Sequence, residues 1–332
     1  MDNSTRLPLL SLPSLVIDEV LSSMIPFELI NLSKASTTCK LIVKSFSKNR
    51  IRKNFAIRVS NVEDPVIRFI RNRDYYNLVI TDDNEKDGTL ESEDEDDYHF
   101  EVAYVYSDGE HTMKKFMDVF TDIEKVFNVD IDYCELCLSK FKELYQTILD
   151  WLISTLKSTA LLSLHLREEP VAVVEHTLNS LTMVKHLQIC SPRTTNCAYS
   201  IPDHIELLII YCGEWVKLEH LLSFKASAIY ILRSKLTNED LNVLLKSWMN
   251  MESLQQVTSL SINLINPENF DSVLEDIPHQ IGHPDRISKC NDPEYEQLNG
   301  GFDIQRKDGV VASIFVHRGP EFSLMLMEQV FE

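Results

Sequence analysis

The sequence predicts a mixed α/β protein, in which three short helices near the N-terminus are followed by a β-α solenoid domain with parallel strands. Helical periodicity dominates the first fifty residues, whereas short apolar strands alternate with helices from about residue 139. The chain has 332 residues, 44% of them hydrophobic and 25% charged, which is ordinary for a folded protein of one large or two smaller domains. We expect three regions, with bounds 7–50, 51–138 and 139–332.

The first helix is predicted by an apolar stripe at a spacing of four residues. Val16, Val20 and Met24 recur at this spacing, and Pro13 suits the first turn of a helix. One short amphipathic helix is expected here.

The second and third helices follow without a long connection. Pro26 starts the second, and Ser36 with Thr37 can cap a third that runs to Phe46. A unit of fewer than about 40 residues seldom buries enough apolar surface to be stable alone. We therefore expect these helices to pack on a partner or on the rest of the chain.

The region 51–138 is predicted to connect the two parts through helix and strand, and it contains a strongly acidic segment. Residues 77–81 and 100–106 alternate like strands, and the segment 82–97 between them has ten Asp or Glu and one Lys. Because like charges repel and cannot form a core, an exposed acidic loop is the first interpretation. A docking site for a basic partner is the second.

The region after residue 139 contains five strand cores of the form Leu/Ile-x-Leu/Ile. Their successive offsets are 23, 21, 21 and 31 residues, which overlap the period of leucine-rich repeats without their asparagine ladder. We therefore predict a degenerate, leucine-rich-repeat-like solenoid with parallel strands. The cores are Leu164/Leu166, Leu187/Ile189, Leu208/Ile210, Ile229/Ile231 and Leu260/Ile262.

Helices and one hairpin complete this region. A helix is expected over 142–156 before the first strand, and others over 171–181, 214–224, 238–248 and 268–277. Near the end, segments 302–306 and 310–316 flank Asp308 and Gly309, a pair typical of a hairpin turn.

The strands should present one side to the core and the other to a partner. Because side chains alternate across a strand, the residues between the core positions share the open face. An exposed apolar and aromatic patch typically marks a binding surface, although another segment such as the C-terminal hairpin could cover it. The candidate substrate-binding residues are Gln188, Leu207, Ile209, Tyr211, Tyr230 and Leu232.

The charge distribution argues against a general nucleic-acid binder. The net charge is −19 and the pI about 4.9, whereas phosphate binding needs clustered Lys and Arg. Residues 1–58 carry nine basic and four acidic residues, or +5, which leaves −24 on the remainder. The cluster 48–53 fits the end of a helix, with a nuclear localisation signal or a nucleic-acid patch as alternatives.

No catalytic, metal or cofactor site is predicted. There is no G-x-S-x-G elbow, phosphate-binding loop or stretch of about 18 apolar residues for a membrane helix. Cys134 and Cys137 have the spacing of a metal or redox pair, but no second pair follows and packing positions flank them. Seven scattered cysteines favour a reducing compartment, either cytoplasmic or nuclear.

Two groups of residues resemble known families. Leu12-Pro13, Val16, Val20-Leu21, Met24, Pro26, Glu28-Leu29, Leu32-Ser33 and Leu41-Ile42 resemble the F-box. Cys212-Gly213-Glu214-Trp215, Leu218 to Leu221, Ser234 to Asn242, Leu245 to Trp248 and Gly301 to Gly309 resemble the type 2 F-box-associated domain of nematode F-box proteins, whose core would span about 205–316.

The resemblance implies a non-catalytic substrate receptor of an SCF-type cullin-RING ubiquitin ligase. The F-box would bind a Skp-type adaptor and through it a cullin, and the associated domain would bind a protein substrate. The residues that would face the adaptor are Leu12, Pro13, Val16, Val20, Leu21, Pro26, Leu29 and Leu32. The alternatives are a protein-binding scaffold outside ubiquitination, possibly nuclear, and an enzyme within the repeat domain.

Overall fold

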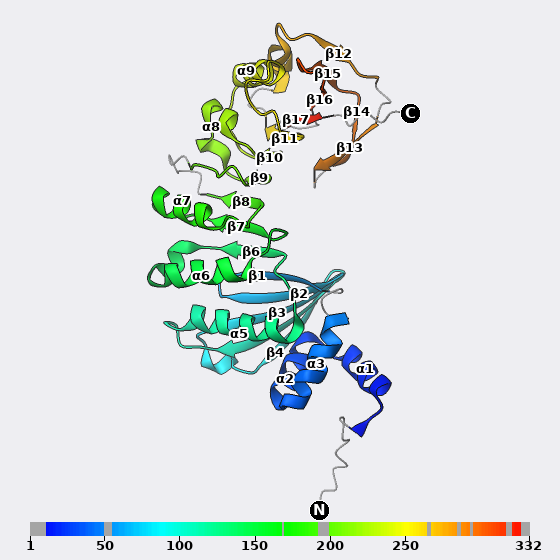
Figure 1. The fold of residues 1–332 in the computed structure, drawn as a ribbon, viewed down its shortest axis with the longest axis vertical. Helices are drawn as coiled ribbons and strands as arrows, with labels where there is room; N and C mark the ends of the chain where they lie inside the picture. The colour runs from blue at the N-terminus through cyan, green and yellow to red at the C-terminus, as the bar shows by residue number, and fades with distance from the viewer. Residues whose placement is uncertain are drawn as a thin grey trace, which may run out of the picture. The chain divides into compact units, whose positions relative to one another are not determined.

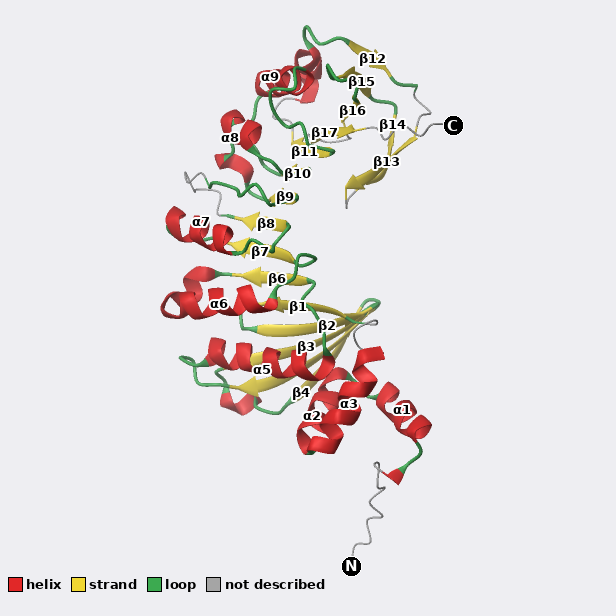
Figure 2. Ribbon diagram, in the orientation of Figure 1, coloured by secondary structure: helices red, strands yellow, loops and turns green. Residues whose placement is uncertain are grey.

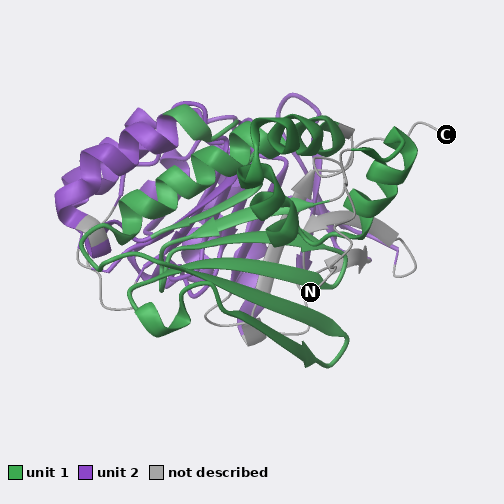
Figure 3. Ribbon diagram, turned by 90° about the horizontal axis from the view of Figure 1, so that it is seen from below, with its two compact units in different colours: residues 1–136, 154–157 green, residues 137–153, 158–332 purple. Residues whose placement is uncertain are grey.

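The computed structural model describes residues 11–49, 55–167, 169–191, 199–263, 267–283, 287–292, 295–316 and 321–326. The chain divides into two compact units, which are coloured separately in Figure 3. The first comprises residues 1–136 with 154–157, and the second comprises 137–153 with 158–332. Each unit is described by itself.

Three helices open the first unit, at the places that the sequence predicts. They are α1 (Ser14–Ser23), α2 (Pro26–Ala35) and α3 (Thr37–Asn49). The Oγ atom of Ser36 accepts a hydrogen bond of 3.1 Å from the backbone N–H of Cys39, as expected for a helix cap. At the start of α2, the carboxylate of Glu28 accepts one of 3.0 Å from the N–H of Ile25.

Six neighbouring strands and one long helix follow the three helices in the first unit (Figures 1 and 2). The spatial order of the strands is β6 (Tyr133–Leu136), β1 (Ala56–Ser60), β2 (Val66–Arg71), β3 (Asp74–Thr81), β5 (Tyr98–Tyr106) and β4 (Leu90–Glu95). Helix α5 (Thr112–Phe127) packs on one face of this sheet, and α2 and α3 pack against α5.

Aromatic side chains join these layers. Phe116, Phe120 and Phe127 of α5 are buried, and the ring of Phe127 meets that of Phe69 on β2 at 5.9 Å. The ring of Phe27 on α2 meets that of Tyr76 on β3 edge-on at 6.2 Å. The N-terminal helices therefore belong to the core of this unit.

The prediction of an acidic loop over 82–97 is wrong. This segment contains a short 3-10 helix, η2 (Asn84–Lys86), and then β4, which pairs antiparallel with β5. Strands β3 and β5 are parallel neighbours, so the acidic strand lies beyond β5. The acidic composition predicted a loop because carboxylates cannot form a core. All six residues of β4 are exposed, however, so its carboxylates stay hydrated although the segment is a strand.

The second unit begins with helical turns and then a run of parallel strands. The 3-10 helix η3 (Leu138–Leu144) and helix α6 (Tyr145–Thr155) replace the single helix expected over 142–156. Five parallel strands follow: β7 (Leu161–His165), β8 (His186–Cys190), β9 (Leu207–Ile210), β10 (Ala228–Ile231) and β11 (Ser259–Asn263).

Helices alternate with these strands and lie on one side of them in Figure 2. They are α7 (Val171–Ser180), η4 (Gly213–Trp215), α8 (Leu218–Ser223), α9 (Asn238–Met249) and η5 (Pro267–Leu274). The mixed α/β class is confirmed, and the leucine-rich-repeat-like solenoid stays a prediction.

The register corrects one strand core. Leu162 and Leu164 of β7, rather than Leu164 and Leu166, lie beside Leu187 and Ile189 of β8. The sequence pattern allows either pair to form the strand core, because three buried leucines, Leu162, Leu164 and Leu166, follow one another at a spacing of two residues.

The sheet of the second unit ends in antiparallel strands. Strand β17 (Glu321–Leu326) pairs with β11, followed by β16 (Val311–Val316), β15 (Phe302–Gln305) and β12 (His279–Ile281). Strands β13 (Ile287–Asp292) and β14 (Tyr295–Asn299) form a separate pair. The predicted hairpin is present, and Gly309 adopts φ +93° in its turn.

One arginine holds this hairpin to α9. Arg306 is buried, and its guanidinium donates to both carboxylate oxygens of Asp308 at 2.9 and 2.8 Å and to the carbonyl of Gln255 at 2.9 Å. The guanidinium also lies 5.1 Å from the ring centre of Trp248, which is fully buried. The Arg306 guanidinium lowers the pKa of the Asp308 carboxyl.

We expect the pairing of β4 with β5 to weaken as pH rises through the titration of His99. Hydrogen bonds to Asp94 (2.7 Å) and Glu101 (3.3 Å) raise the pKa of His99 above its ordinary value. Because the pKa of His99 is raised in the folded state, its protonated ring stabilises the strand pair fully below about pH 6.5. This stabilisation is lost as the pH rises through the folded-state pKa.

An NMR titration of the His99 ring should therefore give a midpoint above about 6.5, and amide exchange in β4 should accelerate more than the intrinsic rate between about pH 6 and pH 8. The variant His99→Gln should remove the excess acceleration. A midpoint at or below the value of free histidine would contradict this account.

Candidate functional site

The three N-terminal helices have an inner and an outer side. On the inner side, Leu21 and Val43 are fully buried, and Leu29 is 1% exposed. Burial of apolar side chains of this size against the neighbouring helix and sheet stabilises the unit by about 1.5–3 kcal/mol each. This side supports the fold of the first unit and is closed to a partner in this structure.

The predicted adaptor-facing residues are divided between the two sides. Leu21, Pro26 and Leu29 are buried within the chain. Pro13 is exposed, Val16 is 42% exposed, and the other three residues, Leu12, Val20 and Leu32, are half-buried. The sequence could not separate these groups, because both sides of such a small helix set are apolar.

Two exposed leucines were missed by the sequence analysis. Leu15 on α1 is 82% exposed, and Leu41 on α3 is 64% exposed. Leu15 lies beside the stripe that begins at Val16, and Leu41 was noted only as part of a motif. The signal available in the sequence was that each leucine lies outside the apolar stripe of its helix, which indicates an exposed position. With Val16, these residues give the outer side an apolar character.

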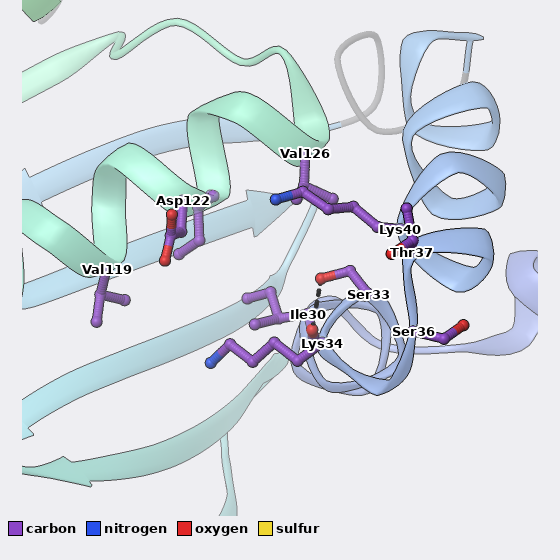
Figure 4. A pocket seen from close by; sticks show the side chains of 10 residues that line it. Ile30, Ser33, Lys34, Ser36, Thr37, Lys40, Val119, Asp122 and Val126 are labelled. Carbon is purple, nitrogen blue, oxygen red and sulfur yellow. Dashed lines mark hydrogen bonds between the residues drawn. The ribbon is translucent and has the colours of Figure 1, made fainter.

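A groove of about 450 Å³ lies between α2, α3 and α5 (Figure 4). Ile30, Val119 and Val126 supply apolar lining, and Lys34 and Lys40 supply charge. The hydroxyl of Ser33 also lines the groove, and it donates 2.7 Å to the carbonyl of Ile30 in its own helix. No sequence pattern predicts this groove, because it exists only where α5 packs beside the helices.

The predicted open face of the second unit is more enclosed than expected. Gln188 and Tyr230 are each 8% exposed. The Nε2 atom of Gln188 donates 2.9 Å to the Oγ atom of Ser163, and the hydroxyl of Tyr230 lies 3.3 Å from that of Ser259. Their placement on an exposed surface is corrected: these side chains satisfy their polar groups within the sheet.

The other four predicted residues are more accessible. Leu207, Ile209 and Leu232 are half-buried, and Tyr211 is 42% exposed. Ile209 pairs in register with Gln188 on one side and Tyr230 on the other, so these residues form one row across the sheet. The accessible part of the face therefore lies towards Tyr211, just after the end of β9.

The cysteines of the Cys-x-x-Cys motif are both buried. Burial raises the pKa of Cys134 to about 12, so its thiol stays protonated at neutral pH and is a poor nucleophile or metal ligand. Cys137 is 0% exposed. Within the described ranges, no group of three or more His, Cys, Asp and Glu side chains could hold a metal ion.

Comparisons with known proteins identify two domains. The F-box domain family matches residues 9–51, and the F-box associated family matches residues 200–262. Skn-1 dependent zygotic transcript 15 protein of Caenorhabditis elegans is 26% identical over 345 residues, covering 91% of this chain and 92% of that protein. No solved structure matches significantly. Among the described helices, none is long and apolar enough to cross a membrane.

The first domain match contains the outer side of the N-terminal helices, and the second contains the accessible residues near Tyr211. The F-box match contains α1, α2 and α3 with their inner and outer sides. The F-box-associated match runs from before β9 to β11 and ends before the antiparallel strands, so it covers a shorter segment than the expected core of 205–316. Domains of these two kinds are typical of non-catalytic adaptors.

Truncation of an inner and an outer leucine should separate the two sides of the helices. We expect Leu29→Ala to lower the free energy of unfolding by about 2–5 kcal/mol, because it leaves a cavity in the core. Leu15→Ala should change it by less than about 0.5 kcal/mol, because Leu15 is 82% exposed. Urea denaturation of both variants gives these values, and equal losses would contradict the assignment of sides.

Proposed function

We propose that this chain, which carries an F-box domain and an F-box-associated domain, is the substrate-receptor subunit of an SCF-type cullin-RING ubiquitin ligase. The observation that carries the proposal is the outer side of α1 and α3, where Leu15, Val16 and Leu41 stay exposed after the inner side has packed. Exposed apolar groups on a helical unit favour a protein partner.

The proposed adaptor surface differs from the set of residues that the resemblance suggests. Its exposed members are Pro13, Leu15, Val16 and Leu41, and three half-buried residues, Leu12, Val20 and Leu32, would complete it. The buried Leu21, Pro26 and Leu29 instead hold the helices in place. Binding of a Skp-type adaptor here would recruit a cullin.

The contribution of such a receptor is proximity. It holds a target protein near a charged ubiquitin carrier and so raises the effective concentration of the acceptor lysine, without performing chemistry of its own. No cofactor is required for this role. We place the chain in the cytoplasm, the nucleus or both, where cullin ligases act, and we do not assign it nucleic acid as a partner.

The β-α domain, arranged as a degenerate leucine-rich-repeat-like solenoid, would bind the protein substrate. Its candidate surface is the accessible side of the row through Ile209, together with Leu207, Tyr211 and Leu232. Tyrosine is typical of interface centres because its ring buries apolar area while its hydroxyl stays available for hydrogen bonding. Gln188 and Tyr230 would support this row from within the sheet.

Charges on the outer side of the F-box should abolish adaptor binding. We expect Val16→Asp with Leu41→Asp to reduce co-purification of a Skp-type adaptor and cullin by at least about tenfold, because an unpaired charge would be desolvated in the interface. The control is Val243→Asp on α9, since Val243 is likewise exposed, at 48%, but lies in the other unit.

Both proteins should keep the circular dichroism spectrum of the wild type, because the three side chains are exposed. Retention of adaptor by the doubly charged variant would overturn the proposed surface. If the wild-type chain itself retained no adaptor, the scaffold role outside ubiquitination would replace the ligase role.

A charge at Tyr211 should affect substrate without affecting the adaptor. We expect Tyr211→Asp to deplete, by at least about fivefold, the proteins that become ubiquitinated in the reconstituted ligase, because it places a charge in an apolar interface. Adaptor binding should stay at the wild-type level. Quantitative mass spectrometry of ubiquitinated products, with Val243→Asp as the control, makes this comparison, and an unchanged product set would contradict the assignment.

A further inference from the structure

The acidic strand β4 is the terminal strand of its sheet. In the order of strands it follows β5, and no described strand pairs with its outer edge. An unpaired edge presents a row of backbone N–H and C=O groups that can bind another extended segment. All residues of β4 are exposed, so the edge is accessible.

Three glutamates of β4 lie on one face of the sheet. Glu91, Glu93 and Glu95 alternate along the strand, and they pair in register with Val102, Phe100 and Tyr98 of β5. Alternate residues of a strand are about 6.6–6.8 Å apart on the same face. The carboxylates therefore repeat at the spacing of the alternate side chains of an extended peptide.

The opposite face of β4 is already neutralised in part. Asp94 on that face accepts a hydrogen bond of 2.7 Å from His99. On the glutamate face, the hydroxyl of Tyr104 donates 2.9 Å to Glu91. Among the described side chains, no cation forms an ion pair with any of the three glutamates. Three of the four carboxylates of β4 therefore lie on one face.

The glutamate face also carries aromatic rings that bind cations. Tyr75 and Phe100 stack at 5.0 Å, and Tyr98 is next to both. The guanidinium of Arg73 lies 6.0 Å from the ring centre of Tyr98 while it pairs with Asp97 at 2.5 Å. Lys86 lies 4.7 Å from the ring centre of Tyr104. The chain itself therefore shows how this surface accommodates basic side chains.

We propose that β4 is a docking strand for an extended, basic segment of a partner protein. The segment pairs with the outer edge of β4, and Arg or Lys at its alternate positions lies opposite Glu91, Glu93 and Glu95. Opposite charges directly across a strand pair stabilise it, and like charges destabilise it. The same charges therefore disfavour the pairing of two copies of this chain, and they repel nucleic acid.

This inference does not depend on the ligase role, because it concerns a different face of the first unit from the outer side of α1 and α3. The probe for its test is a fluorescein-labelled peptide of alternating arginine and valine. Its binding to the full chain is followed by fluorescence anisotropy at a salt concentration of about 0.15 M, at which exposed charges further apart than about 8 Å are largely screened.

Neutralisation of the glutamates should weaken this binding. We expect Glu91→Gln, Glu93→Gln and Glu95→Gln together to raise the dissociation constant at least fivefold. The matched control is Glu252→Gln, Asp271→Asn and Glu275→Gln, which removes three exposed carboxylates from the second unit and should change it less than twofold. An equal loss in the control would show that only the overall charge acts, and it would overturn the proposal.

A second probe tests strand pairing without any variant of the protein. The same peptide with N-methyl groups on the backbone amides of one edge keeps its charge but cannot donate hydrogen bonds from that edge. We expect the wild-type chain to bind one of the two edge-methylated peptides at least fivefold more weakly than the unmodified peptide. Binding of both edge-methylated peptides as tightly as the unmodified peptide would overturn strand addition, as would preferential binding of a glutamate-valine peptide.

Discussion

The packing of α2 and α3 on α5 and β3 is the contact on which the first unit depends. Three short helices cannot bury their own apolar faces, so the chain supplies a long helix and a sheet to cover one side of them. This contact decides the role of each apolar residue: Leu21 and Leu29 become core, whereas Leu15, Val16 and Leu41 remain exposed. It also means that removing the helices would uncover α5, so point substitutions probe the function more cleanly than truncation.

Each unit combines a surface suited to protein partners with a folded scaffold that positions this surface. In the first unit, the apolar outer side of the helices and the acidic edge of β4 differ in chemistry and belong to different elements, as expected for the two different partners that we propose. In the second unit, parallel strands form a row through Ile209 that also contains the buried Gln188 and Tyr230. This arrangement fits a receptor that joins proteins to one another.

Local patterns located the three N-terminal helices and the strand cores of β8 to β11, because periodicity depends on neighbours in the sequence, but they did not locate α5, and η5 is a 3-10 helix where an α-helix was expected. The Ser36 cap before α3 and the paired apolar residues of β8 to β11 were found in this way. Elsewhere the prediction was wrong where contacts between neighbouring strands decide the structure. Leu162 rather than Leu166 joins the register of β7, and Gln188 is buried because Ser163 on the next strand accepts its hydrogen bond. The acidic strand β4 was missed because its pairing with β5 and its position at the edge of the sheet depend on tertiary structure.

The most direct test of the receptor account is hydrogen–deuterium exchange of the full chain with and without a purified complex of Skp-type adaptor and cullin. The account predicts slower exchange in residues 14–23 and along α3 when the complex is present, whereas the strands of the second unit keep their rates. Unchanged exchange in α1 and α3, or protection confined to the second unit, would contradict the claim that the N-terminal helices bind the ligase.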